Sequence, residues 1–196
     1  MNTVQISYDI HKEVNPSLTL EKYQELSNGD FEIETQKMAE QGKYTVPENY
    51  FEKRHAGVHK ATIQEILRDT IQNLSQKYKL YIVSSSPSSV VRTFLKNQNL
   101  EQCFVDIRGR DTDVDKVVKF KQILSEENVT KDDCVFITDT LHDLEDANEV
   151  GIKSIAVTWG LHFKSNLEKG NPAKIIDNPA ELEVSVEEIF AHSAVV

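Results

Sequence analysis

Polar side chains follow two apolar runs of the sequence, at the points where each run ends. Ser84 comes directly after Leu80–Val83, and Asp139 comes directly after Cys134–Thr138, with Asp143 four residues further on. A serine hydroxyl beside the N–H groups of a helix start can bind a phosphate oxygen. Two carboxylates within one turn, together with waters and phosphate oxygens, suit the hard cation Mg²⁺. These positions indicate part of a magnesium-dependent phosphoryl-transfer site.

Lys116 is a further candidate, because it begins a predicted helix. The helix macrodipole opposes a cation in the first turn, so a functional role would account for it. Each candidate also has a purely structural interpretation: Ser84 can be only a helix cap, and Lys116 can be a solvated surface lysine. The pair Asp139 and Asp143 is harder to explain in this way, since a cap needs only one acid.

From residue 79 onward, short β-rich runs alternate with helical stretches. Strands are predicted at residues 80–83, 104–107, 134–138, 154–158 and 174–176, and helices at residues 88–97, 116–126, 141–150 and 185–192. This alternation predicts right-handed crossovers and a parallel sheet of an α/β protein. Ligands of such sheets bind at the carboxyl ends of the strands, where Ser84 and Asp139 are expected.

The first part of the chain has a different pattern. Helices are predicted at residues 1–14, 18–26, 31–41 and 59–77, with a turn at Asn28–Asp30. The helix at 59–77 has the clearest apolar face, which includes Ile66 and Leu74. We therefore expect two parts, a helical region of residues 1–76 and an α/β core of residues 77–196.

The net charge of −10 argues against nucleic-acid binding, which relies on clustered Lys and Arg. No apolar run approaches the roughly 20 residues that span a bilayer, so no membrane partner is expected. The first residues lack the basic start and apolar middle of a secretory signal, which favours a cytoplasmic protein. The two cysteines, Cys103 and Cys134, have no metal-type spacing and are expected to be reduced core residues.

The ordered set of motifs resembles the haloacid dehalogenase-like hydrolase superfamily, most of whose members are phosphatases. Tyr81–Ser86 is similar to the second motif of that family, Lys116 to its third-motif lysine, and Phe136–Asp143 to its fourth motif with paired acids. Residues 151–160 and 172–182 are typical of its phosphoglycolate-phosphatase-like members. The resemblance implies a Rossmann-like parallel sheet with helices on both faces and a helical cap formed by residues 1–76.

The resemblance also implies the chemistry. Ser84 and Lys116 would bind the phosphate, and Asp139 and Asp143 would bind Mg²⁺. The expected reaction is hydrolysis of a small phosphorylated molecule, a phosphate monoester, through an aspartyl-phosphate. Specificity in the family comes largely from the cap, where Lys53, Arg54, His55 and His59 are candidates for substrate contact or, alternatively, a solvated helix start. Trp159 and His162 follow a strand end and are candidates for the rim of the cleft, with packing as the alternative for Trp159.

The first motif of the family is a strand that ends in Asp-x-Asp and supplies the nucleophile. No Asp-x-Asp with such a strand occurs near the N-terminus; Asp9 in Ile6–His11 is the nearest candidate. We interpret residues 1–14 instead as the first cap helix, so that the chain begins after its nucleophile and the central strand of the sheet is missing. Ser84 and Lys116 cannot replace a carboxylate nucleophile, so we expect the chain itself to be inactive and its Mg²⁺ binding weakened or lost.

Two alternatives remain open. The first is a non-catalytic binding or regulatory protein that keeps the fold and binds a phosphorylated ligand through Ser84, Lys116 and backbone amides. The second is an intact enzyme that uses Asp9 as its nucleophile. The sequence does not indicate the substrate or the oligomeric state.

Overall fold

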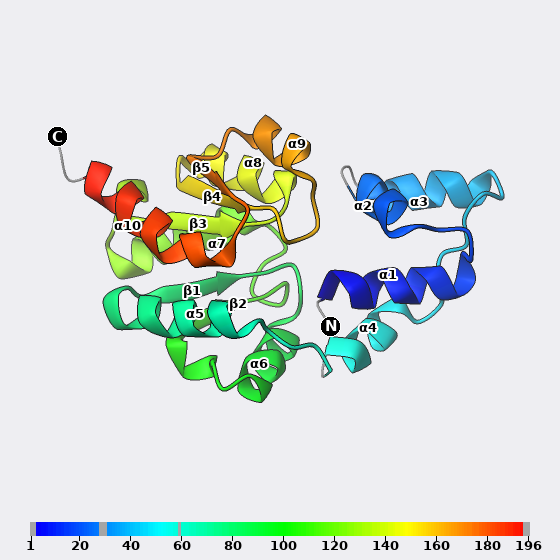
Figure 1. Ribbon diagram of the computed structural model, residues 1–196, viewed down its shortest axis with the longest axis horizontal. Coiled ribbons are helices and arrows are strands. Elements are labelled where there is room, and N and C mark those ends of the chain that lie inside the picture. The colour runs from blue at the N-terminus through cyan, green and yellow to red at the C-terminus, as the bar shows by residue number, and fades with distance from the viewer. Residues whose placement is uncertain (1–2, 28–30, 59, 194–196) are drawn as a thin grey trace.

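The computed structural model describes residues 3–27, 31–58 and 60–193 and has a helical part beside an α/β part (Figure 1). The helical part contains α1 (Thr3–Val14), α2 (Leu20–Leu26), α3 (Phe31–Glu40) and α4 (Tyr50–Val58). We call these four helices the cap and the α/β part the core. The predicted turn at Asn28–Asp30 and the candidate His59 lie outside the described residues.

Aromatic and aliphatic side chains from several cap helices form the interior of the cap. His11 of α1 is surrounded by the rings of Tyr23, Phe31, Tyr44 and Tyr50, with ring centroids 4.8–6.0 Å away. Burying such rings removes a large apolar area from water, which stabilises a small helical unit. The Thr19 hydroxyl caps α2 by accepting from Lys22 N at 3.1 Å.

The single helix predicted at residues 59–77 is wrong at its start. The helix α5 spans Glu65–Lys77, and the separate helix α4 was not predicted. The segment before α5 is not helical, and the amide of Gln98 binds it: this side chain donates to Ala61 O at 3.2 Å and accepts from Ile63 N at 3.3 Å. Ile66, expected on the buried face, is exposed, whereas Leu74 is buried.

The core contains five short strands: β1 (Leu80–Val83), β2 (Phe104–Arg108), β3 (Val135–Thr138), β4 (Lys153–Val157) and β5 (Lys174–Ile176). All pairings are parallel, as predicted. Within the described residues they form two ladders, β1 with β2, and β3 with β4 and β5. The strands β1 and β3 do not pair with each other.

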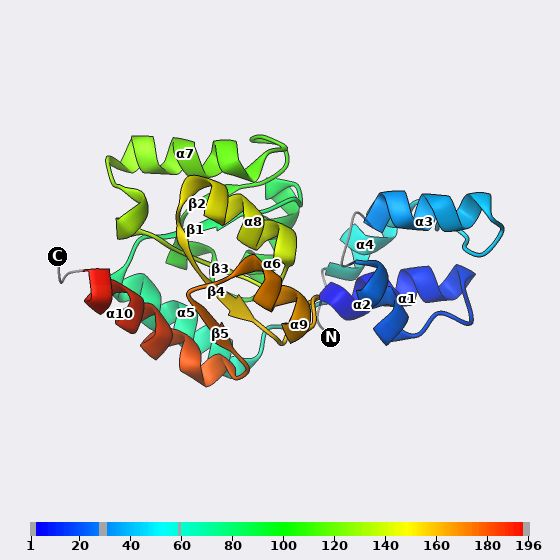
Figure 2. The same ribbon diagram turned by 90° about the horizontal axis from the view of Figure 1, so that it is seen from above.

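Helices cover both faces of the strands (Figure 2). They are α5 and α10 (Leu182–Ser193) on one side, and α7 (Lys116–Glu127) and α8 (Leu141–Val150) on the other. The two remaining helices of the core are α6 (Ser88–Asn97) and the short α9 (Lys164–Leu167). The side of α5 and α10 packs through Leu74, Ile155 and Val186, and the side of α7 and α8 through Phe120 and Ala147. Each fully buried Leu, Ile, Val or Phe side chain contributes about 1.5–3 kcal/mol to folding. The expected Rossmann-like α/β arrangement is therefore confirmed.

The cap meets the core at the carboxyl ends of the strands. Gln24 of α2 donates to Leu161 O, after β4, at 3.1 Å. Arg54 of α4 donates to Ser86 Oγ, after β1, at 3.1 Å. Since parallel α/β sheets bind ligands at this edge, the boundary between cap and core is where a site is expected. None of the described helices is both long and apolar enough to span a bilayer.

Candidate functional site

Lys116 and Asp143 form a buried ion pair at the carboxyl end of β3. Lys116 is the first residue of α7 and is 9% exposed, and its Nζ donates to Asp143 Oδ1. Thr138 Oγ1, at the end of β3, donates to Asp143 Oδ2 at 2.8 Å. Asp115 caps α7 by accepting from Val117 N at 2.8 Å. Two residues far apart in the sequence, both selected as site candidates, thus lie in direct contact.

Asp139 is fixed by the loop that follows β4. Its Oδ2 accepts from Leu161 N at 2.7 Å, and its carbonyl oxygen accepts from His162 N at 3.1 Å. The loop approaches so closely that a Cβ at Gly160 would lie 2.1 Å from Asp139 Oδ2. A residue without a Cβ is therefore needed at that position. The loop thereby fixes the orientation of the carboxylate.

Ser84 lies directly after β1 in a tight turn. Its Oγ accepts from Ser86 N at 3.0 Å, and its own N–H donates to Arg108 O at 2.9 Å, which continues the ladder to β2. Since the hydroxyl accepts from the backbone, its proton remains available to donate to an anion. This geometry supports both the capping and the phosphate-binding interpretation of Ser84.

Lys119 is a part of this region that the sequence reasoning missed. It lies one turn after Lys116 on α7, is completely buried, and donates through Nζ to Ser84 O at 2.9 Å and to Gly109 O at 3.4 Å. Burial, and then the neighbouring charge of Lys116, lower the pKa of Lys119. The spacing of three residues from Lys116 was the available signal, because residues i and i+3 share one helix face.

The assignment of Asp139 and Asp143 as Mg²⁺ ligands stays a prediction. Both carboxylate oxygens of Asp143 are engaged, by Lys116 and Thr138, and one oxygen of Asp139 is engaged by Leu161 N. Across the described residues, no group of three or more His, Cys, Asp or Glu side chains is arranged to hold a metal. Magnesium requires near-octahedral oxygen coordination, so these two acids would hold it together with waters, phosphate oxygens or further ligands.

Asp9 lies on the helix α1, because the preceding residues 4–8 are helical and do not form a strand. Its Oδ1 accepts from Gln5 Nε2 at 2.7 Å, within the same helix. The structure therefore does not bring Asp9 to the end of a strand, which the Asp9 alternative required.

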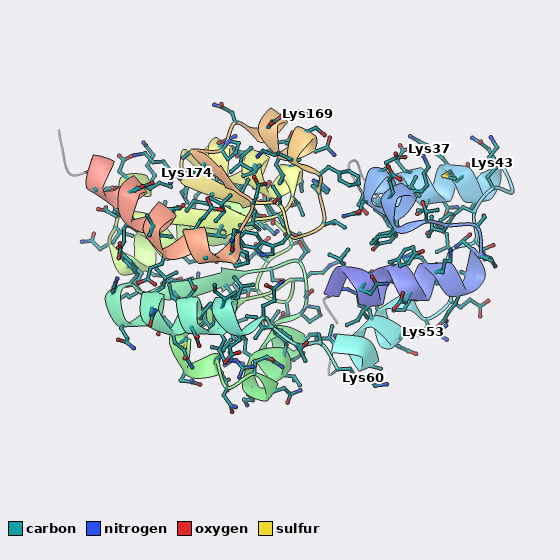
Figure 3. The ribbon with its side chains drawn as sticks, viewed as in Figure 1. Lys37, Lys43, Lys53, Lys60, Lys169 and Lys174 are labelled. Carbon is teal, nitrogen blue, oxygen red and sulfur yellow. The ribbon has the colours of Figure 1, made fainter. Side chains whose placement is uncertain are left out.

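The other cap candidates differ in their surroundings. Lys53 lies at the periphery of the cap (Figure 3) and pairs with Glu13 Oε2 at 2.6 Å. His55 lines a small cavity between α4 and α6 with Val90 and other residues of α6. Arg54 is half-buried and points to the core, where it donates to Ser86. Of these three side chains, Arg54 is the one that hydrogen-bonds to the turn containing Ser84.

The two candidates for the cleft rim, Trp159 and His162, also differ in their surroundings. Trp159 packs against the buried cluster of β4, β5 and α10, which supports the packing interpretation. His162 is buried; its Nδ1 accepts from Leu141 N at 2.8 Å and its Nε2 lies 2.6 Å from Ser27 O of the cap. Because Nδ1 accepts, Nε2 carries the proton and donates to the cap. His162 thus joins the cap to the start of α8.

A family model for haloacid dehalogenase-like hydrolases matches residues 1–157. The chain belongs to this family. Among curated relatives, the phosphoglycolate phosphatase of Synechococcus elongatus is 25% identical over 116 residues, which cover 59% of this chain and 55% of the relative. The pyrophosphatase PpaX of Bacillus mycoides is 28% identical over 123 residues, which cover 60% of this chain and 57% of the relative. The chain thus matches little more than half the length of these relatives.

Solved structures agree on the fold of this haloacid dehalogenase-like chain. A hydrolase of this family from Streptococcus pneumoniae superposes with a TM-score of 0.76 at 21% identity, covering 94% of this chain and 90% of the other. A haloacid dehalogenase-like protein of unknown function from Agrobacterium tumefaciens gives a TM-score of 0.79 at 15% identity, with coverage of 95% and 90%. At these identities the likeness concerns the fold alone.

Proposed function

We propose that this chain carries the phosphate-binding part of a phosphatase site that acts on a small phosphate monoester. The observation that supports this most is the pair of lysines on α7. Lys116 contacts Asp143 beyond the end of β3, and Lys119 contacts the carbonyl of Ser84 at the end of β1. One helix thereby connects the ends of two strands that do not pair with each other. The family membership and the named activities of the relatives agree with this proposal.

In the proposed site, each side chain has a separate task. The ammonium of Lys116 neutralises charge on the phosphate, and the Ser84 hydroxyl donates to one of its oxygens. Asp143 positions Lys116 through their ion pair. A cation and oriented donors at a developing negative charge stabilise the transition state, because they need no reorganisation during the reaction. Mg²⁺, which the family resemblance implies, would require ligands beyond Asp139 and Asp143.

The nucleophile is the component that these residues do not supply. The resemblance implies an aspartate at the end of a strand, and the facing edges of β1 and β3 offer a position for such a strand, since they form no ladder with each other in the described part of the chain. Without that carboxylate, no aspartyl-phosphate forms, and neither Ser84 nor Lys116 replaces it. The 196 residues by themselves therefore bind phosphate without turning it over.

A second candidate function is binding of a phosphorylated ligand without catalysis. The full engagement of Asp143 by Lys116 and Thr138 favours it, because a carboxylate in that state serves the lysine and not a metal. In that case the same residues bind the phosphate, and an added nucleophile has no effect.

The decisive experiment measures phosphate release from p-nitrophenyl phosphate in the presence of Mg²⁺. The chain alone is expected to be inactive, and a variant with an added strand that ends in Asp-x-Asp-Gly ahead of residue 1 is expected to turn over. The matched control carries Asn-x-Asn in the same strand. Turnover that depends on the added aspartates and is lost in Lys116→Gln supports the phosphatase; binding of inorganic phosphate with no gain of turnover supports the second function. Turnover by the unmodified chain that Asp9→Asn abolishes would contradict both.

A further inference from the structure

We propose that residues 160–162 couple the position of the cap to the orientation of the Asp139 carboxylate, with His162 as the positioning residue of this connection. The segment follows β4 and contacts the cap and the core at the same time. The coupling itself depends only on contacts within the chain. Its consequence for Mg²⁺ rests on the proposed function.

His162 joins the end of a cap helix to the start of a core helix. Its Nε2 donates at 2.6 Å to the carbonyl of Ser27, the residue that ends α2. Its Nδ1 accepts at 2.8 Å from the N–H of Leu141, the first residue of α8. Backbone groups at these helix ends have no partner within their own helix. Since His162 is only 4% exposed, water does not readily replace either bond, and the ring needs both parts in place.

The peptide unit between Leu161 and His162 carries the connection further. Its carbonyl accepts from Gln24 Nε2 of α2 at 3.1 Å, and its N–H donates to Asp139 O at 3.1 Å. The unit is trans and planar, so its C=O and N–H turn together. A shift of α2 therefore changes the direction of the N–H that binds Asp139.

The side chain of Leu161 lies against the interior of the cap, whereas its backbone lies against the core. The side chain packs on the buried cap cluster of Leu18, Tyr23, Leu26 and Tyr44. The N–H of Leu161 donates to Asp139 Oδ2 at 2.7 Å. The apolar packing of the cap is thus one residue away from the carboxylate.

The segment leaves one oxygen of Asp139 for other partners. Gly160 also lies against Oδ2, where a Cβ would come within 2.1 Å. Among the described residues, Oδ1 takes part in no hydrogen bond or ion pair, and the side chain is half-buried. Residues 160–162 therefore set the direction in which Oδ1 is presented. A carboxylate that is already oriented binds a ligand at a lower entropic cost than a rotating one.

The test measures amide hydrogen exchange of the full chain by NMR. The Leu161 amide reports the contact with Asp139, and the Ile155 amide in the middle of β4 is the internal reference for global stability. Gln24→Ala removes a cap contact without touching Asp139. We expect the Leu161 amide to exchange about 5-fold faster and Ile155 to be unchanged, because one hydrogen bond of the connection is lost. Gln36→Ala, the same substitution at an exposed position of α3, is the matched control and should change neither rate.

Two variants of His162 separate its two bonds. His162→Asn keeps an acceptor near the position of Nδ1 and loses the donor to Ser27, so it should accelerate exchange at Leu161. His162→Gln keeps a donor near the position of Nε2 and loses the acceptor, so it should accelerate exchange at Leu141 and spare Leu161. A purely structural role of the ring would affect both amides alike in both variants.

Unchanged exchange at Leu161 in both Gln24→Ala and His162→Asn, or equal acceleration at Leu161 and Ile155, would overturn the proposal. Titration of Gln24→Ala with MgCl₂ tests the proposed function separately, with an affinity about 5-fold below that of the wild type expected if Asp139 is a ligand. Faster exchange at Leu161 with an unchanged Mg²⁺ affinity supports the coupling and contradicts Asp139 as a ligand. Mg²⁺ binding that Asp139→Asn abolishes, with no change at Leu161, overturns the coupling and leaves the proposed function standing.

Discussion

The ammonium of Lys116, in the first turn of α7, donates to the carboxylate of Asp143, in the first turn of α8. Their side chains are 10% and 16% exposed, so the pair is largely removed from water. In a low-dielectric environment each charge depends on the other, because solvent no longer compensates it. This contact therefore contributes to stability as well as to the proposed binding of phosphate.

Removing one member of this pair is expected to destabilise the core. Lys116→Gln leaves the largely buried Asp143 carboxylate with the neutral Thr138 hydroxyl as its remaining side-chain partner among the described residues. We expect a loss of about 3–5 kcal/mol in the free energy of unfolding, as found when one partner of a buried pair is deleted. Urea unfolding of both single variants and of Lys116→Gln/Asp143→Asn completes a double-mutant cycle. The double variant should be more stable than the sum of the single losses implies, and strict additivity would contradict the coupling.

The sequence predicted the strands and the parallel α/β arrangement well, because buried strands that alternate with helices leave a strong apolar pattern. It also identified Lys116 and Asp143, which the structure brings together. It failed at residues 60–64, where the side chain of Gln98 makes two hydrogen bonds to a segment that is not helical. The local sequence pattern does not indicate a contact with a residue so far along the chain.

Two further features lay beyond the sequence pattern. In the sequence, Lys119 is one of several polar residues on α7. In the structure it is completely buried, and its ammonium donates to carbonyl oxygens that follow β1 and β2. The role of Gly160 depends on how closely the loop after β4 approaches Asp139, which is a distance in space. Side-chain environments of this kind are set by the packing of distant segments.

Magnesium binding should be weak, because the two acids offer few free oxygens. We expect an affinity in the millimolar range, measured by calorimetric titration of the chain with MgCl₂, that Asp139→Asn abolishes. The exposed Asp132, at the opposite end of β3, provides the control Asp132→Asn, which should leave the titration unchanged. Tight binding that survives Asp139→Asn would exclude Asp139 as a ligand and with it this part of the site.

The stability of the cap is expected to depend on pH through His11. Its Nδ1 lies 2.6 Å from the Tyr44 hydroxyl, and its Nε2 is buried without a hydrogen-bond partner in the described residues. Burial lowers the pKa of His11 to about 4 and raises that of Tyr44 to about 12, so the neutral phenol donates to a neutral imidazole. The unfolded chain takes up a proton near the ordinary pKa of about 6.5, which the folded chain does not. The free energy of unfolding should therefore fall as the pH is lowered from about 6.5 to about 4, by up to about 3 kcal/mol.

His11→Phe keeps a ring within the aromatic cluster and should remove this part of the pH dependence, whereas the exposed His55→Gln should not. The comparison uses urea midpoints of the three proteins between pH 4 and 7, and parallel slopes for wild type and His11→Phe would show that His11 does not carry the dependence.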